Sequence, residues 1–178
     1  MNVFELGQDW KIAALRTNIH VHFLFVGDNM EIRFMNYAFA LAEKASIIDE
    51  VPIGAVIVKD GKIISYGYNN KEKSNSVFGH AELIAIKEAE KKIGNWRLDN
   101  CDLYVTLDPC PMCASAIKQS RIKNVFSALS NSDEKNEKII LEIFSCDSTN
   151  PTVNFLTNLQ PDKSKKILNS FFKKQRKK

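Results

Sequence analysis

The chain has 178 residues, of which 44% are hydrophobic, 26% are charged and only four are cysteine. This length and apolar content suit one globular domain with a substantial core, and they exclude a small scaffold that depends on disulfides. No apolar run approaches the roughly 18 residues that a membrane-spanning helix needs, so the sequence predicts a soluble protein without a membrane segment.

The formal net charge of +4 hides an uneven distribution of charge along the chain. Residues 163–178 contain eight Lys or Arg and no acidic residue. Residues 1–162 are left with 17 basic and 21 acidic residues, a net charge of −4. The positive charge of the protein is therefore a property of its C-terminal segment.

Residues 1–34 match neither a folded core nor a targeting signal, because their apolar stretch at 21–26 is short and interrupted by a histidine. Met30 and Met35 both lie close to the start of a helical pattern. We predict that this leader is either a disordered extension or a mis-assigned start, and that the domain proper spans residues 35–178.

The first half of the predicted domain combines one helix with a β-hairpin. Residues 35–48 carry Ala and Phe at helical spacing, which predicts a helix. Residues 51–58 form a continuous apolar run, and residues 62–66 return after an Asp-Gly turn, so we expect a hairpin. A loop rich in Asn, Lys and Ser follows at 69–79.

Helices and strands alternate in the next part of the chain. A helix is predicted over 81–92, ended by Gly94, and a strand over 103–107. A second helix is predicted to open at Pro109, and residues 125–128 to form a further strand. Helices that alternate with buried strands indicate an α/β layered domain.

The C-terminal part is predicted as an acidic, polar loop at 131–137 and a basic helix over about 162–176. The apolar residues of this helix share one face, and they are Ile167, Leu168, Phe171 and Phe172. Lysines on the other face often mean no more than a solvated surface. The same arrangement is also what contacts with nucleic-acid phosphates would require.

Three potential metal ligands lie in two short motifs: His80 in His-Ala-Glu, and Cys110 and Cys113 in Pro-Cys-Pro-Met-Cys. One imidazole and two thiolates fill three positions of a tetrahedral zinc site and leave the fourth for water. A closed structural site would need a fourth ligand, and Cys101 and Cys146 have no ligand pattern around them. The motifs therefore predict a catalytic zinc site and cysteines kept reduced in the cytoplasm.

Glu82 follows His80 by two residues, so on a helix the two side chains diverge and the carboxylate stays free. Two thiolates offset the charge of a zinc ion and make its water less acidic than in a three-histidine site. A base is then needed nearby. We predict that Glu82 takes the proton from water and returns it to the substrate and to the leaving amine.

The combination of His-x-Glu with Pro-Cys-x-x-Cys resembles the zinc-dependent nucleobase deaminases. Further segments are similar to the bacterial tRNA-specific adenosine deaminases in particular, namely 50–56, 103–107, 120–122 and 171–173. The resemblance is continuous over about residues 35–125 and resumes at the terminal helix.

This resemblance implies a three-layer α/β/α cytidine-deaminase-like fold, with a mixed five-stranded sheet flanked by helices, in a homodimer. His80, Cys110 and Cys113 would bind one Zn²⁺ per subunit, Glu82 would be the proton shuttle, and Asn69 would hydrogen-bond the flipped-out base. The implied reaction is hydrolytic deamination of adenosine to inosine at the wobble position of a tRNA anticodon loop.

Some features favour other interpretations. From the residues alone, an Asn in a turn such as Asn69 would serve the backbone. Asp108 stands where the resembled family usually has Glu, and the acidic 131–137 segment stands where that family is rich in Gly, Ala and Ser. We expect this segment to affect the fit to RNA and not the metal chemistry. The alternatives are a deaminase of a free base or nucleoside, such as cytosine or guanine, and a non-catalytic zinc-stabilised RNA-binding module, against which Glu82 argues.

Overall fold

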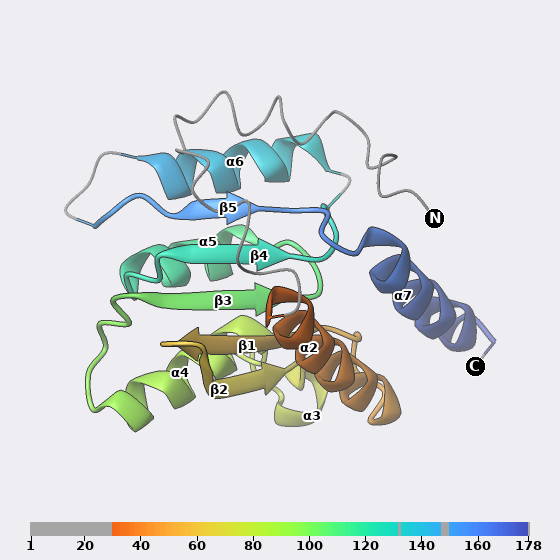
Figure 1. Ribbon diagram of the computed structural model, residues 1–178. Helices are drawn as coiled ribbons and strands as arrows, with labels where there is room; N and C mark the ends of the chain where they lie inside the picture. The colour runs from red at the N-terminus through yellow and green to blue at the C-terminus, as the bar shows by residue number, and fades with distance from the viewer. Residues whose placement is uncertain (1–29, 132, 147–149, 178) are drawn as a thin grey trace, which may run out of the picture.

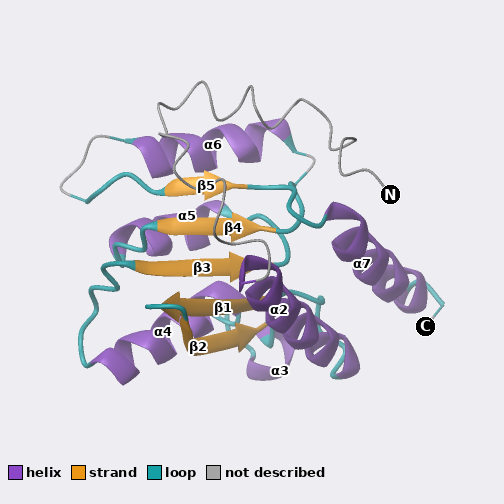
Figure 2. Ribbon diagram, viewed as in Figure 1, coloured by secondary structure: helices purple, strands orange, loops and turns teal. Residues whose placement is uncertain are grey.

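The computed structural model describes residues 30–131, 133–146 and 150–177. Its strands are β1 (Gly54–Lys59), β2 (Lys62–Tyr68), β3 (Cys101–Val105), β4 (Asn124–Ser127) and β5 (Asn154–Leu156). Its helices are α2 (Met30–Ile47), α3 (Lys71–Ser74), α4 (Ala81–Ile93), α5 (Pro111–Gln119), α6 (Glu134–Ser145) and α7 (Pro161–Gln175). Figures 1 and 2 show the sheet at the centre with helices on both sides.

The five strands form one mixed sheet in the order β2-β1-β3-β4-β5. Strand β1 is antiparallel to both β2 and β3, whereas β4 is parallel to both β3 and β5. Helices α4, α5 and α6 cover one face, and α2 covers the other. The predicted three-layer fold with a mixed five-stranded sheet is confirmed.

Alternation along the strands distributes the core between the two layers. Ala55 and Ile57 of β1 face α4 and α5, whereas Val56 and Val58 face α2. The α2 layer also contains the stacked rings of the neighbouring strands, Tyr104 and Phe126, whose centroids are 4.7 Å apart.

The hairpin turn is confirmed. Asp60 and Gly61 have φ angles of 50° and 69°, the left-handed pair that a two-residue hairpin turn requires. The strands themselves are displaced from the prediction, because β1 starts only at Gly54 and β2 continues to Tyr68.

Two glycines let helices approach the hairpin closely. A Cβ at Gly54 would overlap the carbonyl oxygen of Ala38 in α2, and a Cβ at Gly67 would overlap that of Ala81 in α4. The first turn of α4, next to His80, therefore lies directly on the backbone of β2.

Several predicted boundaries differ from the structure. Helix α2 begins at Met30, five residues before its predicted start, because Phe34 adds a buried ring to the core. The 69–79 loop contains the short helix α3. Helix α5 begins at Pro111, not at Pro109. The division into a leader over 1–34 and a domain over 35–178 stays a prediction, since residues 1–29 lie outside the described residues.

The prediction of a loop at 131–137 is wrong, because α6 begins at Glu134. The side chain of Asp133 accepts a hydrogen bond from the backbone N–H of Lys135, and acidic residues suit the positive end of a helix. Ile140 and Phe144 anchor the helix in the core. Acidic residues that suggested a loop are thus the start of an amphipathic helix.

The predicted basic helix is confirmed as α7, which lies at the end of the sheet toward which β3, β4 and β5 point (Figure 1). Phe171 is buried and Phe172 is exposed. No helix in the described part of the chain is both long and apolar enough to cross a membrane.

Candidate metal centre

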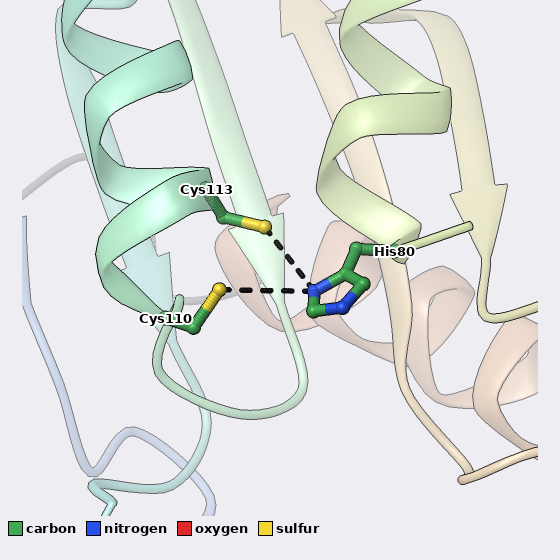
Figure 3. Close-up of side chains that lie close together, drawn as sticks. All are labelled: His80, Cys110 and Cys113. Atoms are coloured by element: carbon green, nitrogen blue, oxygen red, sulfur yellow. Dashed lines mark hydrogen bonds between the residues drawn. The ribbon is translucent and has the colours of Figure 1, made fainter. Parts of the chain in front are cut away.

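Two helix N-termini bring the predicted ligands together. His80 is the N-cap of α4, and Cys110 is the N-cap of α5, with Cys113 in the first turn of the same helix. Figure 3 shows the two sulfur atoms on one side of the gap between the helices and the imidazole on the other, all pointing inward. Cys110 and Cys113 thereby share one site with His80, which lies 30 and 33 residues before them in the sequence.

The distances between the ligand atoms fit a single zinc ion. The Nδ1 atom of His80 lies 3.7 Å from the Sγ atom of Cys110 and 3.5 Å from that of Cys113. Zinc bonds of ordinary length at a tetrahedral angle place a nitrogen and a sulfur about 3.6 Å apart. Among the described residues, no fourth His, Cys, Asp or Glu joins this group. The site thus has the three-ligand composition of a catalytic zinc centre.

The thiol groups of Cys110 and Cys113 shift each other's pKa in opposite directions. A hydrogen bond with the Cys113 side chain lowers the pKa of Cys110 to about 5, with a smaller contribution in the same direction from His80. The same hydrogen bond, together with burial, raises the pKa of Cys113. The two shifts have opposite directions, which favours the loss of the first proton from Cys110, and a bound dication would displace the proton of Cys113.

Glu82 points into the same site from the first turn of α4. The residue is only 4% exposed, and Cys110, His80 and Cys113 all act on the pKa of its carboxyl group. Burial, the largest cause, raises the pKa of Glu82 to about 7, so its carboxyl group can both accept and donate a proton near neutral pH.

Asn69 follows β2 directly and is 8% exposed. Its Oδ1 atom accepts a hydrogen bond of 2.9 Å from the backbone N–H of Ala81, in the first turn of α4. The expectation that an Asn in this turn serves the backbone is confirmed. The contact of Asn69 with a substrate base stays a prediction.

Two buried carboxylates that the motifs did not mark support the site. Asp108 accepts hydrogen bonds from the backbone N–H of Asn131 and the hydroxyl of Thr157. Burial raises the pKa of Asp108, and its hydrogen bonds oppose that shift. Glu50 accepts a bond of 2.7 Å from the backbone N–H of Lys73, which ties α3 to the end of α2. Asp108 already stands out in the sequence as a departure from the resembled family, and its place two residues before Cys110 is a second signal.

Residues 28–129 match the profile of the cytidine and deoxycytidylate deaminase zinc-binding region. The chain belongs to this deaminase family. The deaminase is 40% identical over 143 residues to the tRNA-specific adenosine deaminase of Streptococcus pyogenes, a match that covers 80% of this chain and 90% of that protein. It is 39% identical over 155 residues to the Haemophilus influenzae enzyme of the same name, covering 85% and 88% of the two chains.

Two solved structures of deaminases are also similar to this chain. A structure from a study of A-to-I editing by tRNA:A34 deaminases is 36% identical and has a TM-score of 0.71, covering 77% of this chain and 99% of that chain. Guanine deaminase from Bacillus subtilis is 39% identical with a TM-score of 0.56, covering 70% and 83%. The predicted resemblance is confirmed, and family membership makes the protein a hydrolytic enzyme with a zinc-binding domain.

Proposed function

We propose that this deaminase converts adenosine to inosine at the wobble position of a tRNA anticodon, with one Zn²⁺ held by His80, Cys110 and Cys113. The observation that carries the proposal is the convergence of these three ligand atoms beside the buried carboxyl group of Glu82. The tRNA substrate is supported by relatives named as tRNA-specific adenosine deaminases, which the chain matches over most of their length.

Glu82 is the proton carrier of the proposed reaction. Zinc, when bound, acts as a Lewis acid that lowers the pKa of water. The Glu82 carboxylate accepts a proton from the attacking water and donates it to a ring nitrogen of the adenine. It carries a second proton to the amino group, which leaves as ammonia while the oxygen of water stays on the ring. Adenosine and water thus give inosine and ammonia, and no other reactant is needed.

Helix α7 supplies the surface that an RNA substrate requires. Its exposed side chains include Lys165, Lys166, Lys173 and Phe172. Cations contact phosphates, and an exposed aromatic ring can stack on an unpaired base of a splayed loop. Asn69, at the entrance to α4, is proposed to hydrogen-bond the flipped-out adenine through its side-chain amide nitrogen, which makes no hydrogen bond to the described residues.

A free purine base is the second candidate substrate. The similarity to guanine deaminase from Bacillus subtilis, at 39% identity, is the observation that favours it. An enzyme for a free base would have no use for the phosphate contacts of α7, so the two candidates differ in their dependence on salt.

We further propose a homodimer in the cytoplasm. Phe78, two residues before His80, is 70% exposed, and Val77 and Met112 are exposed apolar side chains close to the ligands in sequence. A second copy could cover such apolar surface. All four cysteines are unpaired, which suits a reducing compartment.

The decisive experiment is an assay of the zinc-loaded protein with an anticodon stem-loop carrying adenosine at the wobble position. Guanine, cytosine and free adenosine are assayed in parallel, and inosine and ammonia are measured. We expect inosine in the stem-loop only. If four cations contact phosphates, the logarithm of the binding affinity should fall with the logarithm of the salt concentration with a slope of about −3. Ammonia from guanine at a comparable rate, without salt dependence, would support the second candidate.

A further inference from the structure

The segment that presents Cys110 is held by side chains from far along the chain. Strand β3 ends at Val105, and α5 begins at Pro111, so residues 106–110 belong to no regular element. Thr106 still pairs with Gly54 of β1, and the carbonyl of Cys110 accepts the first hydrogen bond of α5. The residues between them depend on tertiary contacts for their position.

Asp108 receives most of these contacts. Its side chain is 5% exposed, and its Oδ1 atom accepts a bond of 2.7 Å from the hydroxyl of Thr157, 49 residues away. Its Oδ2 atom accepts a bond of 3.2 Å from the backbone N–H of Asn131, and its own N–H donates to the carbonyl of Leu129. Both carboxylate oxygens are therefore engaged by the segments that follow β4 and β5.

A second contact acts on the same segment. The hydroxyl of Ser164 in α7 donates a bond of 2.6 Å to the carbonyl oxygen of Thr106, and both residues are buried. The segment 106–108 is thus held by hydrogen bonds with Leu129, Asn131, Thr157 and Ser164. Asn131, in the segment that was expected to leave the metal chemistry untouched, thus contacts the segment that carries a ligand.

We propose that Asp108, fixed by Thr157, is a positioning residue that sets the place of Cys110 in the metal site; the inference rests on the metal site of the proposed function. The carboxylate orients the backbone only two residues before the ligand, and the threonine hydroxyl selects the orientation of the carboxylate. Losing the hydroxyl allows the carboxylate to turn, and Cys110 moves with the segment. The region after β4 thereby takes part in metal binding without supplying a ligand.

The test is Thr157→Val, which removes the hydroxyl at constant shape, with Thr157→Ser as the conservative variant that retains it. Zinc affinity is measured by competition with a chelator, and the Co²⁺-substituted protein reports ligand geometry through its visible spectrum. Groups that support a metal site typically change affinity by about 10-fold to 100-fold when altered. We expect a loss in this range and a changed cobalt spectrum for Thr157→Val, and values like those of the original protein for Thr157→Ser.

Ser120→Ala is the matched control, because Ser120 donates a buried hydroxyl bond to the carbonyl of Ile117 at the other end of α5. It should lower the thermal midpoint without changing zinc affinity or the cobalt spectrum. Thr157→Val with unchanged affinity and spectrum would overturn the inference, whatever its thermal midpoint. Failure of the stem-loop assay with the expected Thr157→Val result would overturn the proposed substrate and support the inference. An original protein without cobalt–thiolate absorption would overturn both.

Discussion

Residues 50–119 and residues 130–177 both contribute to the end of the sheet where the ligands lie, by different means. In the first region, the ligands occupy N-caps and a first helical turn, positions that their own local sequence sets. In the second, Asn131 and Thr157 reach the site through hydrogen bonds to Asp108 across 23 and 49 residues. The reactive groups of this enzyme therefore lie in short sequence motifs, whereas the residues that hold those motifs in place come from distant parts of the chain.

Glu82→Ala gives the largest expected effect and tests the first region. Turnover should fall by about 10²-fold to 10⁴-fold, because the proton carrier is lost while all three ligands remain. Zinc content per chain, measured by mass spectrometry, should not change. Glu88→Ala, on the exposed side of the same helix, is the control and should keep normal turnover. Near-normal turnover of Glu82→Ala would refute its role.

Gly67→Ala tests whether the first region depends on close packing. The added methyl group would meet the carbonyl oxygen of Ala81 and push the start of α4, with His80, away from β2. Overpacking of this kind typically costs about 1–3 kcal/mol, to be measured by chemical denaturation. Gly94→Ala is the comparison, since Gly94 has a φ of 72° but open space around it. A smaller loss for Gly67→Ala than for Gly94→Ala would contradict the packing argument.

Glu82→Gln in the metal-free protein tests the cost of burying the carboxylate. Burial raises the pKa of Glu82 from 4.5 to about 7, so the folded state favours the neutral acid. Below pH 4.5 the acid is neutral in both states and the two proteins should differ little. Between pH 4.5 and 7 the unfolded chain ionises while the folded protein keeps Glu82 neutral, so the stability of the original protein falls across this window. Above pH 7 Gln should therefore be the more stable by at most about 3 kcal/mol. Urea denaturation at pH 4 and pH 8 measures the difference; equal stability at pH 8 would contradict it.

Replacing Lys165, Lys166 and Lys173 of α7 by Ala tests the second region and gives the smallest effect. Three phosphate contacts correspond to a change of about 2 in the slope of log affinity against log salt. Turnover at saturating stem-loop should stay the same, because the metal site is untouched. Replacing Lys87, Lys91 and Lys92, three exposed lysines of α4, by Ala is the matched control. If both sets of variants showed the same dependence of affinity on salt, α7 would not be part of the RNA-binding surface.

Much of the first region could be predicted because its signals are short-range. The spacing of His80, Cys110 and Cys113 predicts the group that the structure brings together, and an Asp-Gly pair predicts the hairpin turn. Helix α4 ends at Gly94, as predicted from the αL preference of glycine.

The second region was predicted less well, since its elements depend on contacts with the rest of the fold. The start of α6 has a polar sequence typical of a loop, and only Ile140 and Phe144, buried under the sheet, reveal why it is helical. Strand β5 has three residues, too few for a periodic pattern, and is defined by its pairing with β4. Helix α7 is the exception, because its own apolar face and flanking lysines mark it.

The sequence by itself determined the chemistry: one imidazole, two thiolates and a glutamate at helix starts, which is the composition of a zinc-dependent deaminase. Ligand identity and helix capping depend on neighbouring residues, so they can be deduced without the fold. The tertiary structure alone decided that the His80 and cysteine atoms lie within 4.8 Å of one another, that the pKa of Glu82 rises to about 7, and that Thr157 bonds to Asp108. Each of these depends on desolvation or on a hydrogen bond between distant segments, and both arise only when the layers pack.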